Sequence, residues 1–64
     1  MNNMDFLQDS LQDETMLQSL YNKYMIEVSN PEVRQLFTQL RDTKMKNISQ
    51  LQQEIKTMME QGKN

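Results

Sequence analysis

The sequence predicts an all-α fold, an antiparallel hairpin of two helices that dimerises into a four-helix bundle. Apolar residues recur at intervals of three and four in two long segments, and one short break containing Pro31, the only proline, separates them. A connection this short forces long helices to run antiparallel. We expect a single domain over residues 1–64, with one helix over 4–28, a turn over 29–31 and a second helix over 31–60.

The first helix is predicted from a stripe of apolar residues between positions 4 and 28, with one gap near the middle. These residues are Met4, Leu7, Leu11, Leu17, Tyr21, Met25 and Val28. Asp5, Asp9 and Asp13 repeat every four residues on another face, where acidic side chains early in a helix suit its dipole. Residues 1–3 are expected to form a frayed end.

The break carries two alternative start signals for the second helix. Ser29 and Glu32 fit a capping box, in which the serine hydroxyl accepts from the N3 amide and the glutamate reaches back. Asn30 is the alternative N-cap, and it would place Pro31 at the first helical position, where the missing N–H costs nothing. In both cases the residue before proline is steered out of helical geometry.

The second helix is predicted from a stripe with the same spacing that continues across one lysine. Its members are Val33, Phe37, Leu40, Lys44, Ile48, Leu51, Ile55 and Met58. Gly62, the only glycine, is a suitable stop just past the end of this pattern.

A polar layer is expected in the middle of the hairpin. Folding about residues 30–31 pairs positions whose numbers sum to about 61–62, and one level then breaks the apolar rule on both helices. Gln18 falls opposite Lys44 there, with Glu14 one turn further along, near Ile48. We interpret these three polar residues as a hydrogen-bonded layer that fixes register and oligomeric state. The alternatives are a solvated edge of the seam, or a functional site such as an acid–base pair or an anion site at Lys44.

The half of the first helix near the turn is too apolar for contact with one partner helix. A narrow stripe suffices for a two-helix seam, and a wider arc implies a second contact surface. We therefore predict a dimer interface near the turn, rather than a ligand pocket. Its residues are Leu17, Leu20, Tyr21, Tyr24, Met25, Leu36 and Phe37.

The charges are distributed unevenly between the two halves of the chain. Residues 1–31 carry five acids and one lysine, a net charge of −4, whereas residues 32–64 carry six bases and four acids, a net charge of +2. This asymmetry favours antiparallel contact of the first helix with the second, within one chain or between two. Asp5, Asp9 and Asp13 are read as a solvated acidic face, because calcium ligands usually come from a folded loop.

The composition excludes several classes of function. Cysteine and histidine are both absent, so disulfides, the commonest zinc ligands and Cys–His or Ser–His catalysis are unavailable. We expect no catalytic residue, no metal, no cofactor and no enzymatic activity. The net charge of −2 argues against a nucleic-acid partner. No apolar run approaches the ~20 residues needed to span a bilayer, so a cytoplasmic protein without membrane insertion is expected.

The segment Ser-Asn-Pro-Glu-Val-Arg-Gln-Leu-Phe (29–37) resembles the spore coat protein F-like, ferritin-like helical proteins of spore-forming Firmicutes. The similarity extends over about residues 5–62. Further counterparts of the family pattern are Glu14, Tyr21-Asn22, Ser29 to Arg34, and Met58-Met59-Glu60-Gln61-Gly62. Small sporulation-associated hairpin proteins of undefined role resemble the chain almost as well.

Two departures from this family bear on activity. Family members commonly carry a histidine on the second helix and an Arg-Gly-Trp-Tyr-like tail, whereas this chain has no His or Trp and ends Gln-Gly-Lys-Asn. Ferritin-like di-iron sites combine a Glu of one helix with a Glu-x-x-His of the next. Glu14 could take the first place, but nothing supplies the second, so ferroxidase or catalase chemistry is expected to be absent.

These observations predict a non-enzymatic structural or interaction protein that forms a homodimer. The resemblance implies a role in the spore coat or in sporulation, and a location in the forespore, mother cell or spore coat. The alternative is a helical adaptor or regulator that docks its apolar arc onto a helix of a partner protein. A degenerate ferritin-like metal protein is the third reading.

Overall fold

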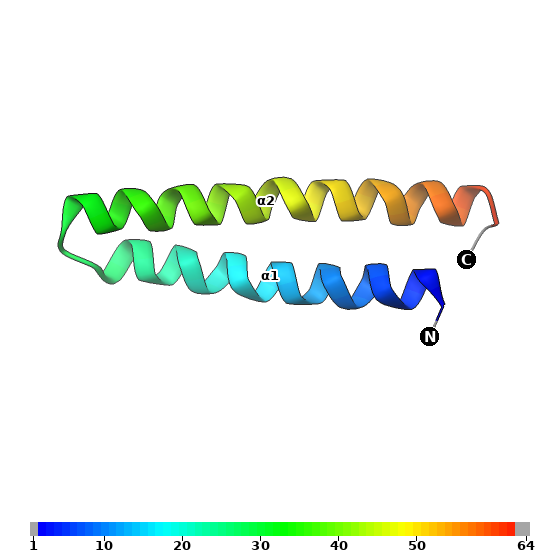
Figure 1. The fold of residues 1–64 in the computed structure, drawn as a ribbon, viewed down its shortest axis with the longest axis horizontal. Coiled ribbons are helices and arrows are strands. Elements are labelled where there is room, and N and C mark those ends of the chain that lie inside the picture. Colours follow the sequence, from blue (N-terminus) through cyan, green and yellow to red (C-terminus); the bar gives the residue numbers. More distant parts are fainter. Residues whose placement is uncertain (1, 63–64) are drawn as a thin grey trace.

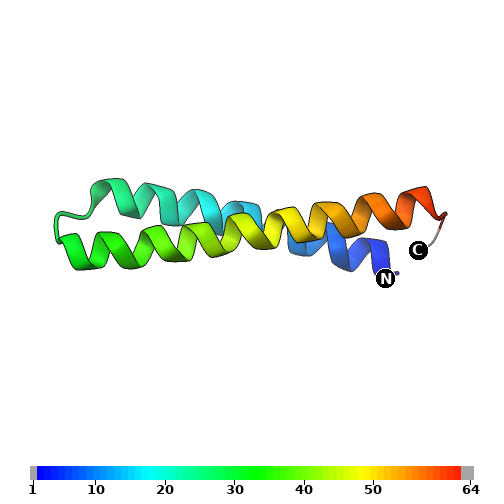
Figure 2. The same ribbon diagram turned by 90° about the horizontal axis from the view of Figure 1, so that it is seen from above.

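The computed structural model describes residues 2–62 as two antiparallel helices, α1 (Asn3–Glu27) and α2 (Pro31–Glu60). They lie side by side along a rod of 48 × 18 × 11 Å, with the turn at one end (Figure 1). Figure 2 shows the helices crossing near their middle. The predicted all-α hairpin is confirmed, with α1 and the turn each displaced by one residue toward the N-terminus.

The start of α1 differs from the expected frayed end. The side chain of Asn2 accepts a hydrogen bond from the backbone N–H of Asp5 at 2.8 Å, and the Asp5 carboxylate accepts one from the backbone N–H of Asn2 at 3.3 Å. This reciprocal pair is a capping box, which satisfies two backbone donors that a helix start leaves unpaired. The prediction of fraying was therefore wrong for residues 2 and 3, and residue 1 lies outside the described residues.

The turn shows which of the two predicted caps is used. The side chain of Asn30 accepts hydrogen bonds from the backbone N–H groups of Glu32, at 2.9 Å, and Val33, at 3.1 Å. Asn30 is thus the N-cap, and the proline is the first residue of α2. At the end of α1 the Val28 carbonyl accepts from Nη2 of Arg34 at 2.8 Å, so the first turn of α2 also stabilises the end of α1.

Substitution of the N-cap should therefore show whether Asn30 or Ser29 caps α2. We expect Asn30→Ala to lower the free energy of unfolding by about 1 kcal/mol, because two amides lose their acceptor. Ser29→Ala is the matched control and should change it by a few tenths at most. Urea titrations followed by far-ultraviolet circular dichroism would measure both. Equal losses in the two variants would mean that the serine shares the capping role.

Helix α2 ends where the sequence predicts. Gly62 has a φ of 66°, which only glycine adopts without strain, and its N–H donates to the Met59 carbonyl at 3.2 Å. The N–H of Gln61 donates to the Thr57 carbonyl at 3.0 Å. Gly62 thus terminates the helix by the left-handed geometry common at helix ends.

The seam between the helices is shielded from solvent only in part. Near the turn the Phe37 ring contacts Tyr21, with centroids 6.1 Å apart, and Tyr24, with centroids 5.4 Å apart. Farther along, Leu7, Leu11 and Leu51 are half-buried. Among residues 2–62, however, no side chain is fully buried. Two helices alone provide a contact stripe and no enclosed core.

The accessible surface of the hairpin reflects this lack of a core. The chain exposes 4801 Å², whereas a compact monomer of 7.7 kDa would expose about 4,300 Å². Neither of the two helices, over the part of the chain described, has an apolar stretch long enough to cross a bilayer.

Candidate functional site

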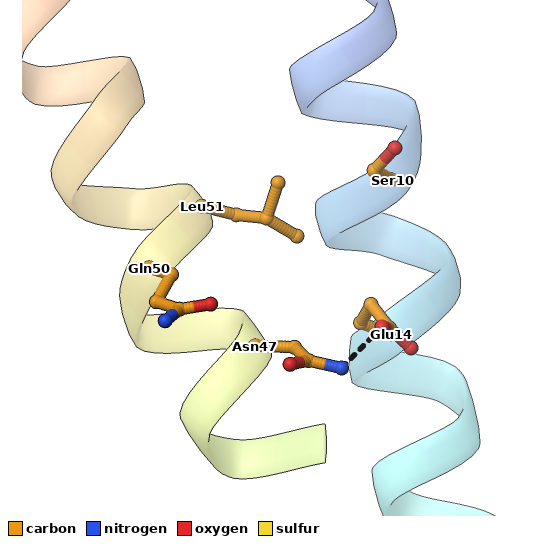
Figure 3. Close-up of a pocket in the computed structure, with 5 residues that line it drawn as sticks. All are labelled: Ser10, Glu14, Asn47, Gln50 and Leu51. Atoms are coloured by element: carbon orange, nitrogen blue, oxygen red, sulfur yellow. Dashed lines mark hydrogen bonds between the residues drawn. The ribbon is translucent and has the colours of Figure 1, made fainter. Parts of the chain in front are cut away.

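A charged pair bridges the middle of the hairpin. Nζ of Lys44 on α2 lies 2.9 Å from Oε2 of Glu14 on α1, and Nδ2 of Asn47 donates to Oε1 of Glu14 at 2.8 Å. The side chains of the lysine and the glutamate are 22% and 19% exposed. Each carboxylate oxygen thus has its own donor from α2, and Figure 3 shows the bond from the asparagine.

The composition of this layer differs in part from the predicted one. Gln18 is half-buried one turn beyond Glu14, but within residues 2–62 its side chain joins neither of the two contacts. Asn47 takes its place as a partner. The predicted register contained the signal for this asparagine, because 14 and 47 sum to 61. Glu14 and Lys44 sum to 58, and the long lysine stem spans the remaining offset.

The two contacts keep the glutamate ionised. The hydrogen bond from Lys44 lowers the pKa of Glu14 below its usual value, the hydrogen bond from Asn47 lowers it further, and the positive charge of the lysine adds to both effects. Partial burial opposes them without reversing the direction. A carboxyl group in this state is a poor general acid near neutral pH. The layer is therefore suited to fixing the helices in register and ill suited to proton transfer.

The lowered pKa predicts a loss of stability in acid. A carboxyl group with a lower pKa in the folded than in the unfolded state stabilises the fold above its unfolded value, near 4.5, and loses this contribution as the pH falls through the folded value. Between pH 6 and pH 3 we expect the melting temperature to fall more in the wild type than in Glu14→Gln. Parallel melting curves for the two proteins would mean that the carboxylate does not contribute.

A second polar contact marks one side of the hairpin. Nη1 of Arg41 on α2 donates to Oδ1 of Asn22 on α1 at 3.1 Å, and Nη2 of the same arginine pairs with Asp42 at 3.0 Å. We call this side of the hairpin the arginine side. The sequence analysis did not find this contact, although positions 22 and 41 sum to 63, close to the predicted register.

An open groove marks the opposite side of the hairpin, because Gln50, which lines it, follows Arg41 by nine residues, about two and a half turns of α2. We call this side the groove side. Ser10 of α1 and Gln50 of α2 line it together with Glu14, Asn47 and Leu51, and its volume is about 340 Å³ (Figure 3). Ligand sites of this size usually enclose most of the ligand surface. Here no lining side chain is buried, so the groove lacks the enclosure of such a site.

The structure divides the predicted dimer interface into two groups. Tyr21, Met25 and Phe37 are half-buried in the seam of the hairpin itself. The other four lie on the groove side, because positions seven residues apart share a helix face. Leu17 and Tyr24 follow Ser10 by seven and fourteen residues, and Leu20 follows Phe6, which lines a second groove together with Ser10, by fourteen. Tyr24 lies at the border of this side, because its ring also contacts Phe37 in the seam.

Apolar side chains and acids form one continuous stripe on the groove side of α1. Phe6 also borders a second groove there, beside Ser10, and Asp13, Leu20 and Glu27 follow it at intervals of seven. We call this surface the α1 stripe. It consists of Phe6, Ser10, Asp13, Leu17, Leu20, Tyr24 and Glu27. Beside it on α2, Leu36 precedes Gln50 by fourteen residues and is 52% exposed.

A second stripe, which the sequence analysis did not separate from the seam, lies on the arginine side of α2. Ile48 and Ile55 follow Arg41 at intervals of seven, and the neighbouring row includes Met45, which is 49% exposed, and Met59, which is 67% exposed. We call this surface the α2 stripe. It consists of Arg34, Thr38, Arg41, Met45, Ile48, Gln52, Ile55 and Met59.

The acidic repeat of α1 serves different purposes along its length. Asp5 belongs to the capping box, whereas Asp9 and Asp13 are exposed. Over residues 2–62 the structure contains no cluster of three or more acidic, histidine or cysteine side chains that could hold a metal ion.

Comparison with known proteins gave no significant match to a protein-family model, a curated protein or a solved structure.

Proposed function

We propose that this chain is a non-enzymatic structural or interaction protein that works by self-association of its hairpin. The observation that carries the proposal is the absence of a buried side chain in residues 2–62, together with large apolar side chains that remain exposed. Chains of this length usually need a metal, disulfides or oligomerisation for stability. This chain has no cysteine or histidine, which favours oligomerisation.

The exposed surface is large enough for such an assembly. A stable protein–protein interface covers about 800 Å² on each partner, roughly a sixth of the 4801 Å² that the hairpin exposes. The smallest closed arrangement is a dimer in which two hairpins form a four-helix bundle. On the groove side it would cover Leu17, Leu20, Tyr24 and Leu36.

The resemblance around residues 29–37 supports a setting in sporulation or the spore coat. The turn that carries this segment is formed by its own residues, with Asn30 as the cap and Arg34 bound to the end of α1. These residues therefore account for the shape of the hairpin, and the biological setting is proposed from the resemblance alone.

The test is the mass from light scattering across a concentration series, with helicity recorded at each point. We expect assemblies of at least twice 7.7 kDa that lose part of their helix content as they dissociate on dilution, while the separated hairpins remain mainly helical. A fully helical monomer at every concentration would overturn self-association. That result would favour an adaptor that presents its apolar arc to a helix of another protein.

A further inference from the structure

We propose that the hairpins join head to tail, with the α1 stripe of one copy packed on the α2 stripe of the next. This inference rests on the proposed self-association and specifies its geometry. It differs from the closed four-helix bundle, in which two copies would meet through the same side of the hairpin.

The first argument is the position of the two stripes. The α1 stripe lies on the groove side and the α2 stripe lies on the arginine side, so no single face of the hairpin contains both. A two-fold dimer through the groove side would bury the residues of α2 that share a helix face with Gln50, and these residues are mainly polar. These residues are Gln39, Thr43, Lys46, Gln50 and Gln53. Such a dimer would also leave the α2 stripe uncovered.

The second argument is the charge of the two stripes. The α1 stripe contains Asp13 and Glu27 and no base, whereas the α2 stripe contains Arg34 and Arg41 and no acid. Arg41 already pairs with Asp42 of its own helix at 3.0 Å, so among residues 2–62 Arg34 is the base of this stripe that has no ion-pair partner within the hairpin. Contact of unlike stripes places acids among bases around an apolar centre. Contact of like stripes brings charges of the same sign together, which disfavours that pairing.

The third argument is the position of the apolar residues along the rod. In the α1 stripe Leu17, Leu20 and Tyr24 lie in the half near the turn, and Phe6 alone lies near the chain end. In the α2 stripe Met45 lies at the middle of the helix, and Ile48, Ile55 and Met59 lie in the half near the chain ends. Apolar contact between unlike stripes is therefore most extensive when neighbouring copies are staggered along the rod or run in opposite directions. Because each added copy presents one uncovered stripe, the contact does not close on itself at two copies.

Two surface variants test this geometry by complementation. Leu20→Glu places a charge in the α1 stripe, and Met45→Glu places one in the α2 stripe, and each charge would be buried at the proposed contact. Ile26→Glu is the control, because Ile26 is 67% exposed and has no member of either stripe three or four residues away on its helix. Circular dichroism would verify that each variant stays helical, and Leu20→Gln replaces Leu20→Glu if the charged variant unfolds.

The expected result has three parts, all measured by light scattering. The wild type and Ile26→Glu exceed the mass of a dimer at high concentration. Leu20→Glu and Met45→Glu are each monomeric at that concentration. An equimolar mixture of the two forms a complex of about twice 7.7 kDa, because each variant supplies the intact stripe that the other lacks.

The other outcomes overturn the inference in distinguishable ways. If Met45→Glu associates like the wild type and Leu20→Glu does not, the copies meet through the groove side, and self-association stands without the head-to-tail geometry. The head-to-tail contact is likewise wrong if the mixture stays monomeric or if both variants associate normally. A wild type that is monomeric throughout removes the inference and the proposed function together.

Discussion

Phe37→Ala is expected to destabilise the hairpin by about 2 kcal/mol. A buried phenylalanine loses 3–5 kcal/mol on truncation, and the value is reduced here because this ring is only half-buried. The ring contacts both Tyr21 and Tyr24, and aromatic pairs contribute beyond the area they bury. Urea titration at low protein concentration, followed by circular dichroism, would measure the loss.

The adjacent residue provides the control for this prediction. Leu36 is 52% exposed and lies on the groove side of α2. Leu36→Ala should therefore leave the stability of the dilute hairpin almost unchanged. If both alanine variants lost the same stability, the three rings would contribute nothing specific to the seam.

The second large effect is expected at the charged layer. Glu14→Ala leaves the half-buried ammonium of Lys44 without its carboxylate, and Lys44→Ala removes both the charge and the stem that spans the seam. We expect both variants to melt several degrees below the wild type. Lys44→Met should melt closer to the wild type, because methionine keeps an apolar stem and Asn47 still donates to the glutamate.

Thermal melts at pH 7 would rank the three variants. Identical melting temperatures for all three and the wild type would identify the layer as a solvated edge of the seam, the alternative left open by the sequence. A lower value for Lys44→Met than for Lys44→Ala would contradict the role given to the lysine stem.

The fold was predictable because periodicity and one break determine it. Two stripes with helical spacing and Pro31 between them allow no other connection, and the boundaries differed by one residue. The caps were harder to predict. Ser29 and Asn30 are both good N-caps in isolation, and the choice depends on which backbone path closes the turn. The Asn2–Asp5 pair was missed because the chain end was assumed to fray.

The sequence indicated roughly which residues of the two helices lie at the same level along the hairpin. It did not indicate how each helix is rotated about its own axis. Pairing by summed positions placed Gln18 opposite Lys44 and Glu14 one turn away, whereas Lys44 in fact pairs with Glu14. Applied to every polar residue, the same pairing would also have suggested Asn47 as the partner of Glu14 and the contact of Asn22 with Arg41. The side of the hairpin on which each exposed residue lies could not be predicted in this way. Whether Leu17 and Ile48 face the same way depends on how each helix is rotated about its axis, and periodicity within one helix contains no information about the other.

The absence of a buried side chain in residues 2–62 also determines how an isolated hairpin responds to heat and denaturant. The heat-capacity change of unfolding and the denaturant m-value both scale with the surface that unfolding exposes. A hairpin that shields little surface should have small values of both, with broad transitions and a stability that varies little with temperature. Sharp, cooperative melting would then be a property of the assembled copies, and the steepness of the transition would itself report how many hairpins unfold together.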